Sequence, residues 1–469
     1  MQLRGVFSLV FLVLSQSLFG QESNYSVYEV GANSSMLAGA VTAGVVDNSA
    51  IYYNPGALGF IENSNLSIET ASLFGGLLRI RNGAGTDLDV KSSFFDVVPS
   101  LLAGTIKSKK DTSMTYAYAF MTTNSAFLKT QIRNLMEYDV IPSLPGPEQY
   151  DGVYEYSNRI RENWVGAAVN KLFSEKLSVG ASLFGVYHSQ DFAFRQEANV
   201  SLPGFDTTRT VGFSRVQRDM EFSSISLVGQ VGFVYRSGNS RFGMNITLPN
   251  WNINVIADGE LSEAVNIFMP TAGQEFASQN HFGKDLKTTH KIPLSVALGY
   301  NIKTPTFGWH FRATFYDGVD TYTRIETDRQ SDFYSGNPVV VEGRADPIVN
   351  LAVGVRKDIR EGLIFLGGLR TDFNYNPNVD PSGLGFSDRL AYWDLYHLSG
   401  GVIWHNDRAY LTLGADYGMG WSRGDKQLIN LTEPTEANFL FGERTNDTRT
   451  YYGQLNVVLG FALTFIDND

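Results

Sequence analysis

The chain has 469 residues with 48 acidic and 37 basic side chains, a net charge of −11, and no cysteine. Disulfides and thiol chemistry are therefore excluded, and the acidic balance argues against nucleic acid as a partner. Aromatic residues make up 13% of the sequence and glycine occurs 46 times, which is typical of a transmembrane β-barrel.

The first twenty residues predict a secretory signal peptide, residues 1–20. Arg4 supplies the positive charge, residues 6–19 form a short apolar stretch, and Gly20 is a small residue at the cleavage position. The apolar stretch is too short to cross a bilayer as a helix. Because no later stretch has the roughly 18 consecutive apolar residues of a membrane helix, strands are the expected membrane-spanning elements.

Residues 21–62 are expected to form a plug, or hatch, in the barrel lumen. This segment is rich in glycine and alanine, barely alternates, and contains the turn-forming tripeptide Asn54-Pro55-Gly56. A barrel of the size predicted below leaks unless its lumen is filled. Two roles are open, a permanent closure of one barrel end and a gate that moves. The predicted centre of the hatch comprises Tyr52, Tyr53, Asn54, Pro55, Gly56, Ala57 and Leu58.

From residue 63 to residue 469 the sequence predicts an antiparallel β-barrel, because hydrophobicity alternates with a period of two. The stretch "LSVGASLFGVY", which begins at Leu177, is the clearest case. We count about fourteen such segments, an even number as single-chain bacterial barrels require. They begin near Asn65, Ser100, Thr112, Tyr154, Leu177, Thr208, Arg241, Ile292, Thr306, Pro347, Gly362, Tyr392, Ala409 and Tyr451.

The lengths of the predicted connections alternate. Every second connection is a short turn, at residues 107–111, 174–176, 237–239, 303–305, 358–361 and 405–407, and the others are mostly long. Short periplasmic turns with longer outer loops explain this alternation and would place both termini in the periplasm. A soluble β-sandwich or propeller does not require it, and its strands rarely exceed about ten residues.

Two of the predicted outer loops have apolar residues at helical spacing, and we expect a short amphipathic helix in each, around residues 126–138 and 260–270. The helices could simply pack on each other above the barrel. Alternatively they form an apolar groove that first binds a hydrophobic ligand. The groove residues would be Leu128, Ile132, Leu135, Met136, Leu261, Val265 and Phe268.

The segment "YYNPGAL", Tyr52 to Leu58, resembles the hatch motif of the outer-membrane long-chain fatty acid and hydrophobic compound transporters of the FadL type. In that family, aromatic residues precede an Asn-Pro-Ala-Gly-Leu-like motif, whereas here Gly56 precedes Ala57. The resemblance implies a fourteen-stranded barrel in a Gram-negative outer membrane with the hatch inside it. It also implies that hydrophobic molecules pass without energy input and leave sideways at a kinked strand.

The expected partners are a hydrophobic small molecule such as a fatty acid and the lipid and lipopolysaccharide of the outer membrane. The alternative to transport is a non-transporting barrel that serves as a structural or docking subunit of an outer-membrane secretion or assembly machine. Such a barrel would hold other outer-membrane proteins through its loops.

Enzymatic function is not expected, and neither is a catalytic residue, a metal site or a cofactor. The sequence has no Gly-x-Ser-x-Gly elbow and no His-Glu-x-x-His motif, and its six histidines are scattered. His188 precedes Ser189, but neighbouring residues in a strand face opposite sides and therefore cannot pair as base and nucleophile. An outer-membrane phospholipase is thus the least favoured hypothesis.

Overall fold

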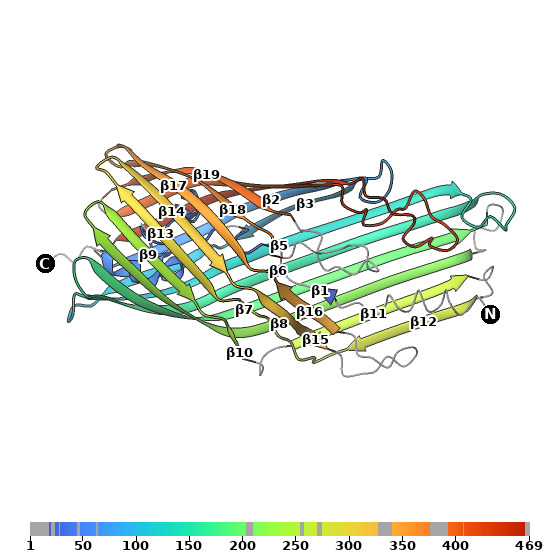
Figure 1. Cartoon of the computed structure of the whole chain (residues 1–469), viewed down its shortest axis with the longest axis horizontal. Helices are drawn as coiled ribbons and strands as arrows, with labels where there is room; N and C mark the ends of the chain where they lie inside the picture. Colours follow the sequence, from blue (N-terminus) through green and yellow to red (C-terminus); the bar gives the residue numbers. More distant parts are fainter. Residues whose placement is uncertain are drawn as a thin grey trace.

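The chain folds into a closed barrel of fourteen antiparallel strands, as the sequence predicts (Figure 1). The computed structural model describes residues 18–19, 24–27, 29–44, 47–61, 64–202, 210–253, 258–269, 274–326, 340–375, 393–406 and 408–464. No helix within these ranges is long and apolar enough to cross a membrane. Most of the predicted signal peptide lies outside the described residues.

The elements follow one another along the chain with few helices. The helices are α2 (Ala32–Met36), α3 (Ala50–Tyr53) and the 3-10 helix η1 (Pro55–Phe60). The strand segments are β1 (Leu18–Phe19), β2 (Asn65–Arg81), β3 (Val90–Val98), β4 (Leu101–Lys107), β5 (Met114–Tyr138), β6 (Glu148–Leu172), β7 (Leu177–Ser201), β8 (Thr210–Ser237), β9 (Ser240–Thr247), β10 (Trp251–Asn252), β11 (Asp258–Met269), β12 (Gln274–Gly283), β13 (Ser295–Lys303), β14 (Phe307–Tyr316), β15 (Val319–Glu326), β16 (Val340–Ala345), β17 (Ile348–Arg360), β18 (Leu363–Asp372), β19 (Leu395–His405), β20 (Ala409–Arg423) and β21 (Arg449–Thr464).

Closure of the barrel comes from the pairing of its first and last strands. β2 pairs with β21 from Asn65 opposite Thr464 to Arg81 opposite Arg449. Several barrel strands are interrupted, so that β3 and β4, β9 to β11, β12 and β13, β14 and β15, and β16 and β17 each count as one strand. Both β3 and β4 pair with β2, for example, and β9, β10 and β11 all pair with β8.

Most predicted strand starts lie within a few residues of the start of a strand segment, and the predicted short turns agree with the structure, whereas Tyr154 lies six residues inside β6. Asn65, Leu177 and Ala409 are the first residues of β2, β7 and β20. The turns between β8 and β9 and between β17 and β18 contain Gly238 and Gly362, whose φ angles of 55° and 72° are left-handed. Glycine adopts this conformation without steric cost, so the turns can be very short.

The two amphipathic helices predicted in outer loops are wrong. Residues 126–138 lie in β5 and residues 260–269 lie in β11. In β5, Ile132 is buried while Leu135 is 56% exposed, so burial follows a period of two. Leu128, Ile132 and Met136 are spaced by four residues, and this spacing places residues on one face of a strand as well as of a helix. The pairing of this segment with β6 shows that it is a strand and not a helix.

The outer wall of the barrel carries many large apolar side chains. They occupy alternate positions along their strands, for example in β4, β5, β20 and β21. The exposed side chains include Leu73, Leu77, Phe95, Leu102, Tyr118, Phe120, Leu183, Phe242, Leu298, Trp309, Phe311, Leu351, Leu398, Trp404, Leu413, Trp421, Tyr451 and Phe461. Exposing so many apolar groups to water would be costly. This surface therefore has the character of a barrel wall that faces lipid.

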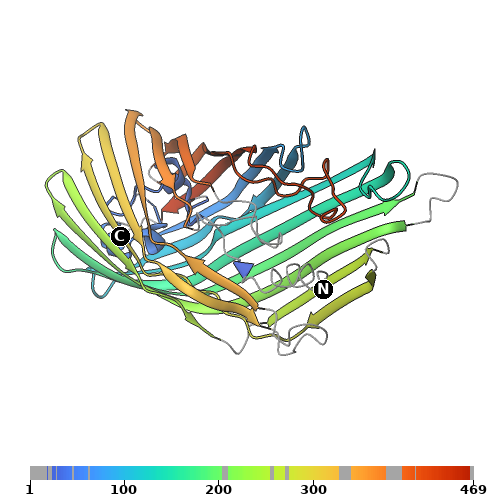
Figure 2. The same ribbon diagram turned by 45° about the vertical axis from the view of Figure 1, so that its right-hand side comes forward.

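Two buried apolar clusters fill the inside of the barrel. The N-terminal cluster joins residues 30–58 to inward-facing wall residues and includes Met36, Leu37, Ile51, Leu58, Trp164 and Phe184. The loop cluster joins the connection 424–448 to the wall and includes Ile141, Tyr150, Phe194, Ile429, Leu431 and Phe441. In Figure 2 the blue N-terminal segment lies inside the barrel, near the short turns.

Candidate functional site

The predicted hatch residues form a compact turn that is bonded to the barrel wall. Asn54 lies between α3 and η1 and is fully buried. Its Oδ1 accepts from the Gly56 N–H at 2.9 Å, and its Nδ2 donates to the carbonyls of Thr42 at 2.6 Å and Phe233 at 3.0 Å. Pro55 begins η1, where its missing N–H has no cost. One side chain therefore fixes the turn and attaches it to β8.

The turn approaches the backbone of the wall so closely that glycine is required. A Cβ on Gly56 would lie 2.7 Å from the carbonyl oxygen of Gly232 in β8. Asn170 of β6 donates to the carbonyls of both Pro55 and Gly56, at 3.0 and 3.1 Å. This contact explains why glycine, and not alanine, directly follows Pro55 in this chain, in the reverse of the order expected from the resemblance.

A buried group of charges also links the N-terminal segment to the wall. Glu29 lies 3.8 Å from Arg312 of β14 and 3.6 Å from Arg370 of β18. Arg370 in turn lies 3.3 Å from Asp416 of β20. The hydroxyl of Tyr53 donates to Glu29 Oε2 at 2.5 Å. Burial, together with the charge of Glu29, raises the pKa of Tyr53 well above its usual value, so the hydroxyl remains a donor.

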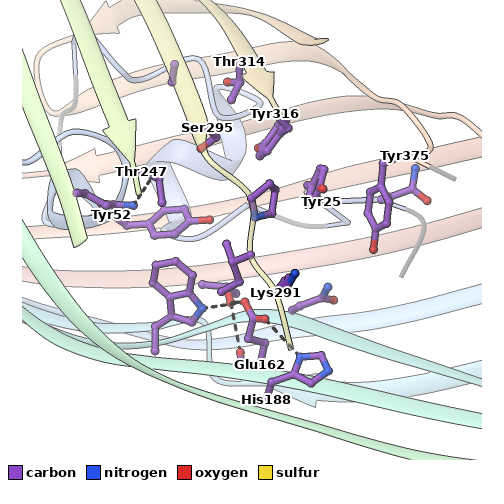
Figure 3. Close-up of a pocket in the computed structure, with 18 of the residues that line it drawn as sticks. Tyr25, Tyr52, Glu162, His188, Thr247, Lys291, Ser295, Thr314, Tyr316 and Tyr375 are labelled. Carbon is purple, nitrogen blue, oxygen red and sulfur yellow. Dashed lines mark hydrogen bonds and ion pairs between the residues drawn. The ribbon is translucent and has the colours of Figure 1, made fainter. Parts of the chain in front are cut away.

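A cavity of about 110 Å³ lies in the lumen beside the N-terminal segment (Figure 3). Its wall combines aromatic rings with charged groups. The aromatic residues are Tyr25, Tyr52, Tyr53, Trp164, Tyr316 and Tyr375, and the charged or titratable residues are Glu162, His188, His290, Lys291, Arg312 and Arg324. Tyr52 contacts Trp164 edge to face, with ring centroids 5.5 Å apart. Such a cavity, with aromatic and polar side chains in its wall, suits a small ligand.

Glu162 lies at the centre of one cavity wall. Its Oε1 accepts from Trp164 Nε1 at 2.8 Å and from Thr123 Oγ1 at 2.9 Å, while its Oε2 lies 3.4 Å from a nitrogen of His188 and 3.4 Å from a nitrogen of His290. Figure 3 shows Glu162 and His188 side by side. None of these residues was predicted as part of a site. Glu162 and His188 lie opposite each other in the β6–β7 hairpin, whereas His290 comes from the connection between β12 and β13 and reaches them only in the folded barrel.

Solved structures match the chain over nearly its whole length. The toluene transporter TodX of Pseudomonas putida superposes with a TM-score of 0.64 at 14% identity, covering 96% of this chain and 100% of its own. A FadL homologue of Pseudomonas aeruginosa superposes with a TM-score of 0.60 at 13% sequence identity, and the match covers 95% of this chain and 100% of the homologue. The toluene transporter TbuX of Ralstonia pickettii superposes with a TM-score of 0.57 at 11% sequence identity, and the match covers 94% of this chain and 100% of TbuX. Neither a family model nor a curated protein sequence matches this chain.

The fold is that of the FadL-type outer-membrane channels. The fold implied by the hatch motif is thereby confirmed, with its fourteen strands and their antiparallel order. The residues quoted for the resemblance fall in α3 and η1, inside this FadL-type barrel, where they contact β6 and β8.

The backbone ladder in the wall of this FadL-type barrel is interrupted beside the cavity. β4 forms a backbone ladder with both β2 and β5, whereas β3 forms one only with β2 among the described residues. Pro99 separates β3 from β4 and has no N–H to donate. Farther along β3, Ser92 Oγ donates to the Lys129 carbonyl of β5 at 2.6 Å. Thr123 and Asn124 of β5, which lie level with this interruption, also line the cavity.

The residues predicted for an outer groove lie on two different parts of the wall. Leu128, Ile132 and Met136 of β5 pack in or against the loop cluster, and Leu135 of the same strand faces outward. Leu261, Val265 and Phe268 lie in β11. β6, β7 and β8 lie between β5 and β11 in the sheet. A groove formed by both sets stays a prediction.

Proposed function

We propose that this protein is a passive outer-membrane channel for small hydrophobic molecules. The observation that carries the proposal is the lumenal cavity, which is lined by six aromatic residues and borders the interruption between β3 and β5. The matching solved structures include two toluene transporters and a FadL homologue, which supports a hydrophobic ligand.

The cavity volume favours small ligands over long acyl chains. A cavity of roughly 150 Å³ lined by apolar side chains holds one benzene molecule. The present cavity, at about 110 Å³, is of that order. A long-chain fatty acid would fit only if the N-terminal segment moved away from the wall. We therefore propose single-ring or short-chain compounds as the first ligands to test, with long-chain fatty acids second.

In this proposal residues 21–62 are the hatch and residues 63–469 the barrel. The ligand enters from the side of the long connections, occupies the cavity, and leaves sideways into the membrane at the interruption beside Thr123 and Asn124. The turn at Asn54-Pro55-Gly56 holds the hatch against β8 and keeps the lumen closed to water. The short turns, and with them both termini, would face the periplasm.

Uptake by cells that produce the protein tests this function. Radiolabelled toluene and octanoate are supplied to an outer-membrane mutant that lacks its own hydrophobic channel. Producing the protein is expected to raise the initial uptake rate of at least one of them. Ala297→Trp should abolish the increase, because Ala297 is buried and lines the cavity. Leu298→Trp is the matched control, because Leu298 follows it on β13 and is 54% exposed on the outer wall.

Native mass spectrometry of the detergent-extracted protein completes the test. A bound small hydrophobic compound in the wild type, lost in Ala297→Trp, would agree with transport. Uptake equal to that of cells without the protein, together with an empty barrel that co-purifies with other outer-membrane proteins, would overturn the channel and favour a docking role.

A further inference from the structure

We propose that Glu162, His188 and His290 form a binding site for a divalent transition-metal ion, of which Zn²⁺ is the best example. The three residues come from β6, from β7 and from the connection between β12 and β13. Among the described residues they are the one group of three histidine or carboxylate side chains whose potential ligand atoms lie within 4.8 Å of one another. This proposal does not depend on the transport function.

The chemistry of the three side chains suits such an ion. Two imidazole nitrogens and one carboxylate oxygen are a common ligand set for zinc in sites that keep a fourth position open for water or another donor. Hard cations such as Ca²⁺ and Mg²⁺ prefer sites made only of oxygen ligands. All three residues line the cavity, so the open position would face it.

The distances are those of long hydrogen bonds, and they are also compatible with metal coordination. Glu162 Oε2 lies 3.4 Å from His188 Nδ1 and 3.4 Å from His290 Nε2. A charge-assisted hydrogen bond between such groups is normally about 2.7–2.9 Å long. Two ligands that each lie about 2.0–2.2 Å from a tetrahedral zinc ion are instead separated by about 3.3–3.6 Å. The observed spacing falls within this range.

The two imidazoles are stacked, with ring centroids 3.8 Å apart and planes 10° from parallel. Both side chains are buried, and the second ring nitrogen of each, His188 Nε2 and His290 Nδ1, has no hydrogen-bond partner. Two buried imidazoles that share one carboxylate oxygen are poorly satisfied by that contact alone. An imidazole binds a metal through the lone pair in its ring plane, so one ring must turn out of the stack when both bind the same ion. The outer ring nitrogens, His188 Nε2 and His290 Nδ1, would then bind water in the cavity.

The carboxylate is already held in the orientation that the site needs. Trp164 and Thr123 both donate to Oε1 of Glu162 and leave Oε2 directed at the histidines. Such outer hydrogen bonds position ligands in metal sites. Arg324, another residue of the cavity wall, donates to Gln190 and stacks on Phe222 at 4.4 Å.

Metal binding is measured on the purified full chain, produced with a tag that contains no histidine. The protein in detergent is stripped with a chelator, dialysed against Zn²⁺, and its metal content is determined by mass spectrometry of the ions. We expect about one Zn²⁺ per chain, and with Co²⁺ the visible absorption of a four-coordinate site. Glu162→Gln keeps an acceptor for Trp164, and this variant and His290→Gln should each weaken binding about tenfold or more.

His310→Gln is the matched control, because His310 is also buried in the wall but contacts Asn301 instead of a carboxylate. It should bind Zn²⁺ like the wild type. Heat-modifiable migration in gels establishes that every variant has folded. The proposal is overturned if the stripped wild type takes up no Zn²⁺, or if Glu162→Gln and His290→Gln bind as much as the control. Uptake of hydrophobic compounds is a separate readout, so either proposal can fail alone.

Discussion

The N-terminal cluster and the loop cluster fill the same barrel in different ways. The N-terminal cluster depends on individual positions: a glycine against a backbone carbonyl, an asparagine with three hydrogen bonds, and a buried glutamate between two arginines. The loop cluster depends on many apolar side chains, with a few side-chain donors that bond to loop carbonyls. A single substitution should therefore disturb the first far more than the second.

The largest effect is expected from Arg370→Gln in the N-terminal cluster. The change leaves Glu29 and Asp416 without their shared cation inside the barrel. Removing one partner of a buried ion pair typically costs about 3–5 kcal/mol. Urea unfolding of the protein in lipid vesicles measures the loss.

The control for that measurement is Arg133→Gln, which removes an ion pair of 2.7 Å with Asp151 on the exposed part of β5. Solvent screens such a pair, so the unfolding midpoint should not move. Equal losses in the two variants would contradict the distinction between the buried and exposed pairs.

A smaller effect is expected from Gly232→Ala in β8. The added Cβ would meet Asn54 Oδ1 and lie 2.8 Å from the Gly56 nitrogen, so the turn at Asn54-Pro55-Gly56 must move. Forced repacking of this kind costs about 1–3 kcal/mol. In planar bilayers the variant should conduct ions more often than the wild type. Gly229→Ala, whose Cβ would lie 3.5 Å from Leu248, should behave like the wild type. Indistinguishable conductance in both variants would mean that this contact does not hold the lumen closed.

The smallest effect is expected in the loop cluster. Tyr150→Phe removes the hydroxyl that donates to the Phe439 carbonyl at 3.0 Å and leaves that carbonyl unpaired. The loss should be about 1 kcal/mol and local to residues 424–448. Limited proteolysis in this connection should become faster while the unfolding midpoint stays constant. Tyr187→Phe, on the outer wall, is the control. A midpoint that falls as far as in Arg370→Gln would remove the difference between the clusters.

The sequence predicted the barrel well, because successive residues of a wall strand point alternately to its inner and outer sides, and this produces a period of two. It also predicted the turn at Asn54-Pro55-Gly56, because Asn-Pro-Gly is a local turn signal. The predicted groove helices failed, since Leu128, Ile132 and Met136 satisfy both periodicities and only pairing with β6 separates them. Glu162 and His188 could have been paired from the sequence, because the short turn at residues 174–176 sets the register of β6 against β7. His290 could not be added to them, because it lies in the connection between β12 and β13 and reaches them only in the folded barrel.

The length of β5 to β8 has a consequence for where the protein meets its surroundings. These strands have 25, 25, 25 and 28 residues, whereas about 9–11 residues suffice to cross the hydrocarbon of a bilayer. More than half of each strand therefore stands above the lipid, on the side opposite the short turns. The opening of the barrel at that end therefore lies well beyond the hydrocarbon of the bilayer.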